Sequence, residues 1–108
     1  MNKEQEKPYG YIYRAVNRIN EKIYIGQTVT SRWEENQIPI KERWNEEIGD
    51  AKRKKRNGEY LRHVENAIIK YGRENFDLFE QNKTYKNQKE LDDKETYLIK
   101  NLVPSIER

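Results

Sequence analysis

The stretch from Tyr9 to Thr28, YGYIYRAVNRINEKIYIGQT, decides the fold of this chain. Its two ends, residues 9–16 and 22–28, are rich in aromatic and β-branched side chains, which favour extended strands. Residues 17–21 between these ends, NRINE, include two Asn and are typical of a turn. The stretch therefore predicts a β-hairpin.

Beyond the hairpin, the spacing of the apolar residues changes from that of a strand to that of a helix. Residues 29–39 are polar and predict a loop or a short irregular insert. A first helix is expected from Ile40 to about Lys55, and a second after Asn57-Gly58, ending at Gly72. The apolar stripes that indicate these two helices consist of Ile40, Trp44, Ile48 and Ala51 in the first and Leu61, Val64, Ile68 and Tyr71 in the second.

The last third of the chain predicts one more strand and one more helix. Residues 76–81, FDLFEQ, are short and alternating, which indicates a strand. Asn87 with Glu90 three residues later resembles a capping box, so a helix should begin there and run to about Asn101. The order β-β-α-α-β-α predicts an α+β fold, a small three-stranded antiparallel sheet flanked by three helices. We expect one domain over residues 9–108, preceded by a flexible tail at residues 1–8.

Composition excludes several classes of protein. The 108 residues are 38% charged and 33% hydrophobic, with no Cys and one His. Disulfides, a thiol nucleophile and a zinc site built from Cys or several His residues are therefore excluded, and any metal should be a hard, oxygen-liganded cation such as Mg²⁺. No apolar run is long enough to cross a membrane, and no signal segment is visible, so a cytoplasmic protein without membrane contact is expected.

Positive charge is concentrated in the middle of the chain. Residues 41–73 carry ten basic and six acidic side chains, although the net charge of the whole chain is only +3. Five consecutive basic residues lie at the centre of this segment: Lys52, Arg53, Lys54, Lys55 and Arg56. Such a run indicates a surface that faces a polyanion, but a solvated helix C-terminus explains it equally well.

A carboxylate interrupts the apolar stripe of the last predicted helix. Glu95 lies between Leu91 and Leu98 in a stripe that continues to Leu102. A charged group on a buried face is costly unless it is paired or binds a metal. Glu95 is therefore a candidate metal ligand; the alternative is a carboxylate at the edge of the stripe that reaches water or a nearby Lys.

The predicted hairpin carries a cluster of tyrosines. If Tyr13 pairs with Tyr24, the hydroxyls of Tyr11, Tyr13 and Tyr24 project from one face, whereas a shift of one residue separates Tyr13 from Tyr24. Phenol oxygens on a sheet can bind a phosphate or a water, although cross-strand aromatic packing is the alternative. Gly26 permits a bulge or the close approach of another group.

Two further side chains have both a chemical and a structural interpretation. Arg43 precedes Trp44 on the first predicted helix, so it is placed to bind a phosphate or simply to extend along the Trp ring into solvent. His63 lies beside the apolar face of the second helix, where a structural or solvent-facing role is expected.

These residues together closely resemble the GIY-YIG nuclease family. The resemblance rests on Tyr11-Ile12-Tyr13, on Tyr24-Ile25-Gly26, and on the helices that carry Arg43 and Glu95. The hairpin stretch, the segment EEIGDAKR, the segment AIIKYGRENF and the segment KETYLIK are similar to phage-encoded and homing-endonuclease members. The similarity spans about residues 9–102.

The resemblance implies a DNA endonuclease that hydrolyses phosphodiester bonds with one Mg²⁺ or Mn²⁺ per active site. It assigns Tyr13 and Tyr24 to the activation of water, Arg43 to stabilisation of the phosphate, and Glu95 to holding the cation. Specificity is expected to come from dimerisation or from a separate C-terminal DNA-binding region. The oligomeric state, the target and the choice between sequence-specific and structure-specific cutting stay open.

Three positions depart from the family pattern. Tyr11 stands where Gly is usual, and Glu47 stands one helical turn after Arg43, where many relatives carry a His. A segment with Asn beyond the last helix, common in the family, has no counterpart before Arg108. The alternative hypothesis is accordingly a catalytically impaired, nuclease-like module that binds nucleic acid or another protein.

Overall fold

The computed structural model describes residues 7–103, so most of the predicted N-terminal tail and the end of the chain lie outside the described residues. The main elements follow the predicted order β-β-α-α-β-α. They are β1 (Gly10–Asn17), β2 (Ile23–Val29), α1 (Pro39–Asn57), α2 (His63–Tyr71), β3 (Phe76–Thr84) and α3 (Gln88–Leu102). Short 3₁₀ turns, η2 (Thr30–Arg32) and η3 (Arg73–Asn75), precede α1 and β3.

Asn17 organises the turn of the hairpin. Its backbone N–H donates to the carbonyl of Lys22, and its own carbonyl accepts from Glu21. The side chain of Asn17 also accepts a hydrogen bond from the backbone of Ile19. These bonds close the turn locally, which explains why a polar segment between two aromatic runs was sufficient to predict it.

The sheet has the order β2-β1-β3 and is antiparallel throughout. The first strand is therefore central, and β2 and β3 form the two edges. The pairing of β1 with β3 shifts between Ile12 and Tyr13, whose partners are Asn82 and Glu80, so Gln81 is an extra residue on β3.

The helices begin and end with recognisable signals. Helix α1 has Pro39 in its first turn and is terminated by Gly58, whose φ of 69° is left-handed and whose N–H bonds the carbonyls of Lys54 and Lys55. Asn87 caps α3 by accepting from the backbone of Glu90, as predicted. The Glu90 carboxylate, however, accepts from the backbone of Tyr85 and Lys86, so it fastens the preceding loop to the helix.

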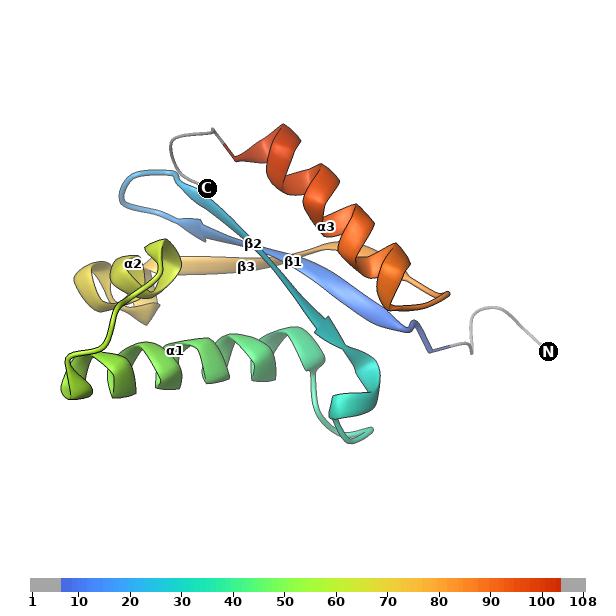
Figure 1. The fold of residues 1–108 in the computed structure, drawn as a ribbon, viewed down its shortest axis with the longest axis horizontal. Helices are drawn as coiled ribbons and strands as arrows, with labels where there is room; N and C mark the ends of the chain where they lie inside the picture. The colour runs from blue at the N-terminus through green and yellow to red at the C-terminus, as the bar shows by residue number, and fades with distance from the viewer. Residues whose placement is uncertain (1–6, 104–108) are drawn as a thin grey trace.

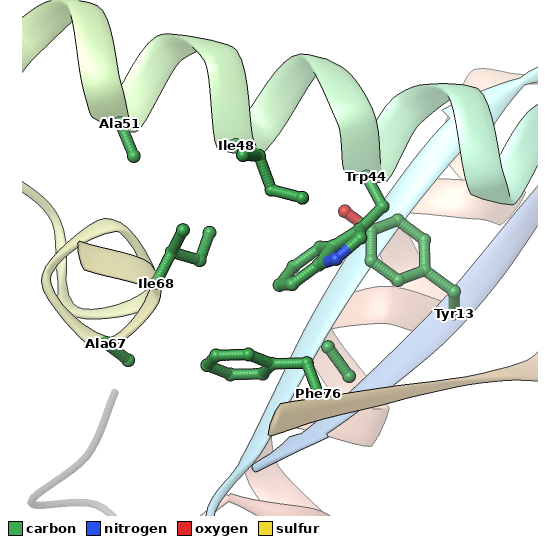
Figure 2. Packing of buried hydrophobic residues seen from close by; sticks show 8 residues of the cluster. Tyr13, Trp44, Ile48, Ala51, Ala67, Ile68 and Phe76 are labelled. Carbon is green, nitrogen blue, oxygen red and sulfur yellow. The ribbon is translucent and has the colours of Figure 1, made fainter. Parts of the chain in front are cut away.

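The helices cover both faces of the sheet, with α1 and α2 on one side and α3 on the other (Figure 1). Against α1 and α2, an aromatic core forms around Trp44, whose ring lies 6.4 Å from that of Tyr13 and 5.4 Å from that of Phe76 (Figure 2). A smaller core on the opposite face joins Ile12 to Leu91 and Leu98 of α3. Successive residues of β1 thus serve opposite layers, Ile12 beneath α3 and Tyr13 beneath α1.

Within residues 7–103, none of the helices has the length and the apolar character needed to cross a membrane.

Candidate active site

A pocket of about 440 Å³ opens beside the edge strand β2, between the helices of the two faces. Tyr13, Tyr24, Arg43 and Glu95, the four residues predicted to be catalytic, all line it. They come from four elements, the two hairpin strands β1 and β2 and the helices α1 and α3, which lie farther along the sequence. The fold therefore brings together the four side chains that the sequence singled out.

Gly26 lets Tyr13 reach this pocket. The two residues are direct partners in the hairpin, and a Cβ on Gly26 would collide with the ring and hydroxyl of Tyr13. The Tyr13 ring therefore lies over the backbone of β2, toward the edge of the sheet. Close approach was one of the two roles predicted for this glycine.

The pairing of Tyr13 with Tyr24, on which the expected tyrosine cluster was conditional, is not found, although its consequence for the two pocket tyrosines holds. Tyr13 pairs with Gly26, and Tyr24 pairs with Ala15. This register differs by two residues from the predicted one, and a shift of two keeps side chains on the same face. Tyr13 and Tyr24 consequently both line the pocket, whereas Tyr11 does not.

Tyr13 is almost completely buried, with 4% of its surface exposed. Burial raises the pKa of its hydroxyl above the usual range; the positive charge of Arg43 acts in the opposite direction but does not compensate. Glu47 and Glu95 raise this pKa further. At neutral pH the Tyr13 hydroxyl is therefore protonated and able both to donate and to accept a hydrogen bond.

Arg43 enters the pocket from α1 next to the buried Trp44, as predicted. Its Nη2 lies 2.9 Å from Oε2 of Glu47, and its Nη1 lies 3.5 Å from Oε1 of Glu46. The side chain is 24% exposed, so the guanidinium is accessible from the pocket while being held on one side. A planar guanidinium with donors to spare suits a phosphate oxygen.

Glu47 is buried and ion-paired on both carboxylate oxygens. Oε2 faces Arg43, and Oε1 accepts a hydrogen bond from Nη2 of Arg62, the residue immediately before α2. Arg62 also lines the pocket, and it was not among the predicted site residues. No local pattern marks Arg62, because its role depends on how α2 packs against α1.

Glu95 lies at the edge of the α3 stripe, partly buried, with its Oε1 3.0 Å from Nε2 of Gln27. Burial raises the pKa of Glu95; the Gln27 hydrogen bond lowers it and neighbouring Asp92 adds to the rise. Glu95 thus lines the pocket and accepts a hydrogen bond from an amide rather than from a Lys, and its role as a metal ligand stays a prediction. Gln27 was not identified from sequence, because its contact with α3 is purely tertiary.

The donors present at Glu95 fit a hard divalent cation. Among residues 7–103, the structure contains no cluster of three acidic, His or Cys side chains that could form a closed metal cage. Mg²⁺ is commonly held by one or two carboxylates and completes its shell with water and substrate phosphate oxygens. A single partly buried carboxylate in an open pocket matches that pattern.

The basic run does not form one continuous surface. Lys54 turns inward, with its Nζ 2.9 Å from Oε2 of the fully buried Glu65. Arg53 pairs with Asp50 and Glu59 on the surface. Lys52, Lys55 and Arg56 are exposed. Of the five, these last three are therefore best placed for a nucleic acid, and none of the five lines the pocket.

Tyr60, shortly before α2, and His63, its first residue, also line the pocket. Tyr60 is 86% exposed, and His63 is exposed as well. Of the two roles expected for His63, structural or solvent-facing, its exposure favours the second, but its place at the pocket was not anticipated from sequence.

Similarity to known proteins is found in the three-dimensional structure and not in the sequence. Neither protein-family models nor curated proteins give a match. Among solved structures, the catalytic domain of homing endonuclease I-TevI superposes with a TM-score of 0.65 at 18% identity, covering 91% of this chain and 92% of that one. The chain therefore shares the fold of this GIY-YIG endonuclease domain.

A second structure with the GIY-YIG fold agrees. The catalytic domain of intron endonuclease I-TevI in a glutamate-to-alanine mutant gives a TM-score of 0.66 at 17% identity, over 91% of this chain and 88% of that one. At this identity the likeness establishes the architecture, an α+β domain with a three-stranded antiparallel sheet and three helices.

Proposed function

We propose that this chain is a DNA endonuclease that hydrolyses phosphodiester bonds with the help of one divalent cation, Mg²⁺ or Mn²⁺. The observation that carries the proposal is the convergence of Tyr13, Tyr24, Arg43 and Glu95 on one pocket, in the fold of an endonuclease catalytic domain. These side chains supply hydroxyl, guanidinium and carboxylate groups to a single space, as phosphate-ester hydrolysis needs.

The four residues divide three roles in the proposed reaction. The hydroxyls of Tyr13 and Tyr24 hydrogen-bond and orient the attacking water, and Arg43 donates to a non-bridging phosphate oxygen as negative charge develops on it. The carboxylate of Glu95 would hold the cation, and Gln27 orients that carboxylate. When bound, the cation supplies Lewis-acid stabilisation of phosphate and leaving-group oxygens.

DNA is the proposed partner. Exposed Lys52, Lys55 and Arg56 lie on the last turns of α1 and offer positive charge to a phosphate backbone. Contacts of this kind carry no sequence information, so they provide affinity rather than specificity.

An impaired, nuclease-like binding module is the second candidate. It is favoured by one observation: Glu47 forms an ion pair with Arg43 inside the pocket. A carboxylate at that place reduces the positive potential that a phosphate would meet.

Nicking of supercoiled plasmid DNA distinguishes the two candidates. We expect nicking with Mg²⁺ or Mn²⁺, none in EDTA, and a loss of at least a hundredfold in Glu95→Gln. Asp93→Asn is the matched control, because Asp93 lies on the same helix and pairs with Lys89 at 2.7 Å outside the pocket. Folded protein that binds DNA without nicking it under any of these conditions would support the binding module instead.

A further inference from the structure

From η2 along α1 to the start of α2, seven charged side chains form a chain of alternating sign. Successive members are within ion-pair distance, and both Arg43 and Arg62 face the pocket. In spatial order the members are Arg32, Glu46, Arg43, Glu47, Arg62, Glu65 and Lys54.

Glu47 is the central member of this chain and the one whose burial needs explanation. Its side chain is 4% exposed, and each of its oxygens meets a different arginine. A buried carboxylate with a single partner would leave one oxygen without a charged donor, so the second arginine completes its pairing. Reciprocally, one negative charge between two guanidiniums lets them lie close together without strong repulsion.

Arg62 is held from two sides but keeps an accessible face. Glu47 and Glu65 both bond its Nη2, and its side chain is nevertheless 53% exposed. A guanidinium has five N–H donors, and these two carboxylates use only one nitrogen of it. The remaining donors of Arg62 are available for a further acceptor.

We propose that Arg43 and Arg62 form a two-arginine phosphate clamp, with Glu47 as the positioning residue that sets their separation. The clamp rests on the proposed function and deepens it, since Arg62 would contact substrate as a second phosphate-binding residue. Two guanidiniums fixed by a shared carboxylate bind a phosphate with less loss of side-chain freedom than two mobile ones. The position of Glu47 one helical turn after Arg43 thereby acquires a role that a neutral residue could not perform.

Binding measurements test Arg62 separately from cleavage. Fluorescence anisotropy with a short labelled duplex in EDTA reports affinity while the cation is absent. We expect Arg62→Met to weaken binding about tenfold, as for the loss of one charge-assisted hydrogen bond, and to lower the slope of log affinity against log salt by about 0.9. Arg73→Met is the control, because Arg73 bonds Asn45 at 2.8 Å outside the pocket. Equal affinities for Arg62→Met and wild type, or equal losses in the two variants, would overturn the clamp.

Arg62→Lys tests whether the planar guanidinium of Arg62, and not only its positive charge, contributes to DNA binding. This variant keeps the positive charge but loses the planar fork, so we expect its salt slope to match wild type while its affinity stays below it. Full recovery of affinity by Lys would show that Arg62 acts only as a point charge, which contradicts the clamp.

Glu47→Gln tests the positioning role through kinetics. Removing a negative charge from the pocket should leave DNA affinity equal or higher, whereas kcat should fall about tenfold because the guanidiniums are no longer fixed. Equal or higher kcat would overturn the role of Glu47. If Glu47→Gln does not fold, the binding measurements with the Arg62 variants still test the clamp. If the wild-type protein binds DNA but never nicks it, the proposed nuclease function fails, and the same binding measurements still show whether Arg62 binds phosphate.

Discussion

Gly26 of β2 lies directly opposite Tyr13 of β1, and the Tyr13 ring fills the space that a Cβ on Gly26 would occupy. Gly26→Ala must therefore displace either the tyrosine or the edge strand. We expect a loss of about 1–3 kcal/mol in the free energy of unfolding, as for other overpacked sites, together with loss of nicking. Urea unfolding measures the first effect.

Gly49→Ala is the control for this glycine. Gly49 lies inside α1, where an added Cβ meets no atom within 4 Å. Because Ala favours helix, this substitution should stabilise by up to about 1 kcal/mol. Similar effects at both glycines would contradict the close packing of Tyr13 on Gly26.

Tyr13→Phe separates the chemistry of the hydroxyl from the packing of the ring. The ring meets Trp44 edge-on at an interplanar angle of 75°, and Phe can keep that contact. Stability should change by less than about 1 kcal/mol, and nicking should fall at least a hundredfold because the water loses an orienting group. Tyr97→Phe, on the exposed side of α3, should leave both unchanged. Full activity in Tyr13→Phe would remove the hydroxyl from the mechanism.

Glu95→Gln should lose activity without losing stability. Burial raises the pKa of Glu95, so the folded state binds its proton more tightly than the unfolded chain does. Ionisation of Glu95 therefore lowers the free energy of unfolding as the pH rises above the usual carboxyl range, and Gln, which cannot ionise, avoids this loss. Thermal melting should place Glu95→Gln at or above wild type at pH 7, with the difference shrinking in acid. A variant clearly less stable than wild type at pH 7 would contradict this.

The basic run should divide into two functional classes. Lys52, Lys55 and Arg56 are exposed. Replacing all three by Gln should lower the affinity for DNA and reduce the slope of log affinity against log salt, while the melting temperature stays unchanged. Lys54→Met should instead destabilise the fold by about 2 kcal/mol, because it removes a partner of buried Glu65. Anisotropy and melting curves on both variants test this; equal melting temperatures for Lys54→Met and wild type would refute the structural role.

Glu65 should make the fold sensitive to acid. Burial alone would raise its pKa, but the backbone N–H of Arg62 and the side chains of Lys54 and Arg62 outweigh burial and lower the pKa to about 2. A depressed carboxyl pKa contributes stability above about pH 4.5 that is lost as the pH falls toward 2. The contribution is about 3 kcal/mol from a shift of this size. Unfolding of wild type and Glu65→Gln should therefore converge in strong acid, and a constant difference across that range would contradict the assignment.

The sequence by itself determined the order of the elements of this protein and pointed to several residues of its pocket, among them Tyr13, Tyr24, Arg43 and Glu95. The hairpin, the ends of α1 and the cap of α3 depend on side chains within a few residues of one another, such as Asn17 in the turn and Gly58 after the helix. Glu95 was conspicuous because a carboxylate broke a local apolar period. Signals of this kind act over one or two turns, so they can be read along the chain.

Only the tertiary structure decided which polar and charged side chains pair with one another. Arg62 donates to Glu47, fifteen residues away in the sequence, and Gln27 donates to Glu95, 68 residues away. Lys54 turns away from the other basic residues of its run and pairs with Glu65. The register of the hairpin, too, placed Gly26 rather than Tyr24 opposite Tyr13. Such pairings depend on how helices pack on the two faces of a sheet, and burial then makes each misplaced or unpaired charge costly. Periodicity predicts which face a residue occupies, whereas its partner is set by packing.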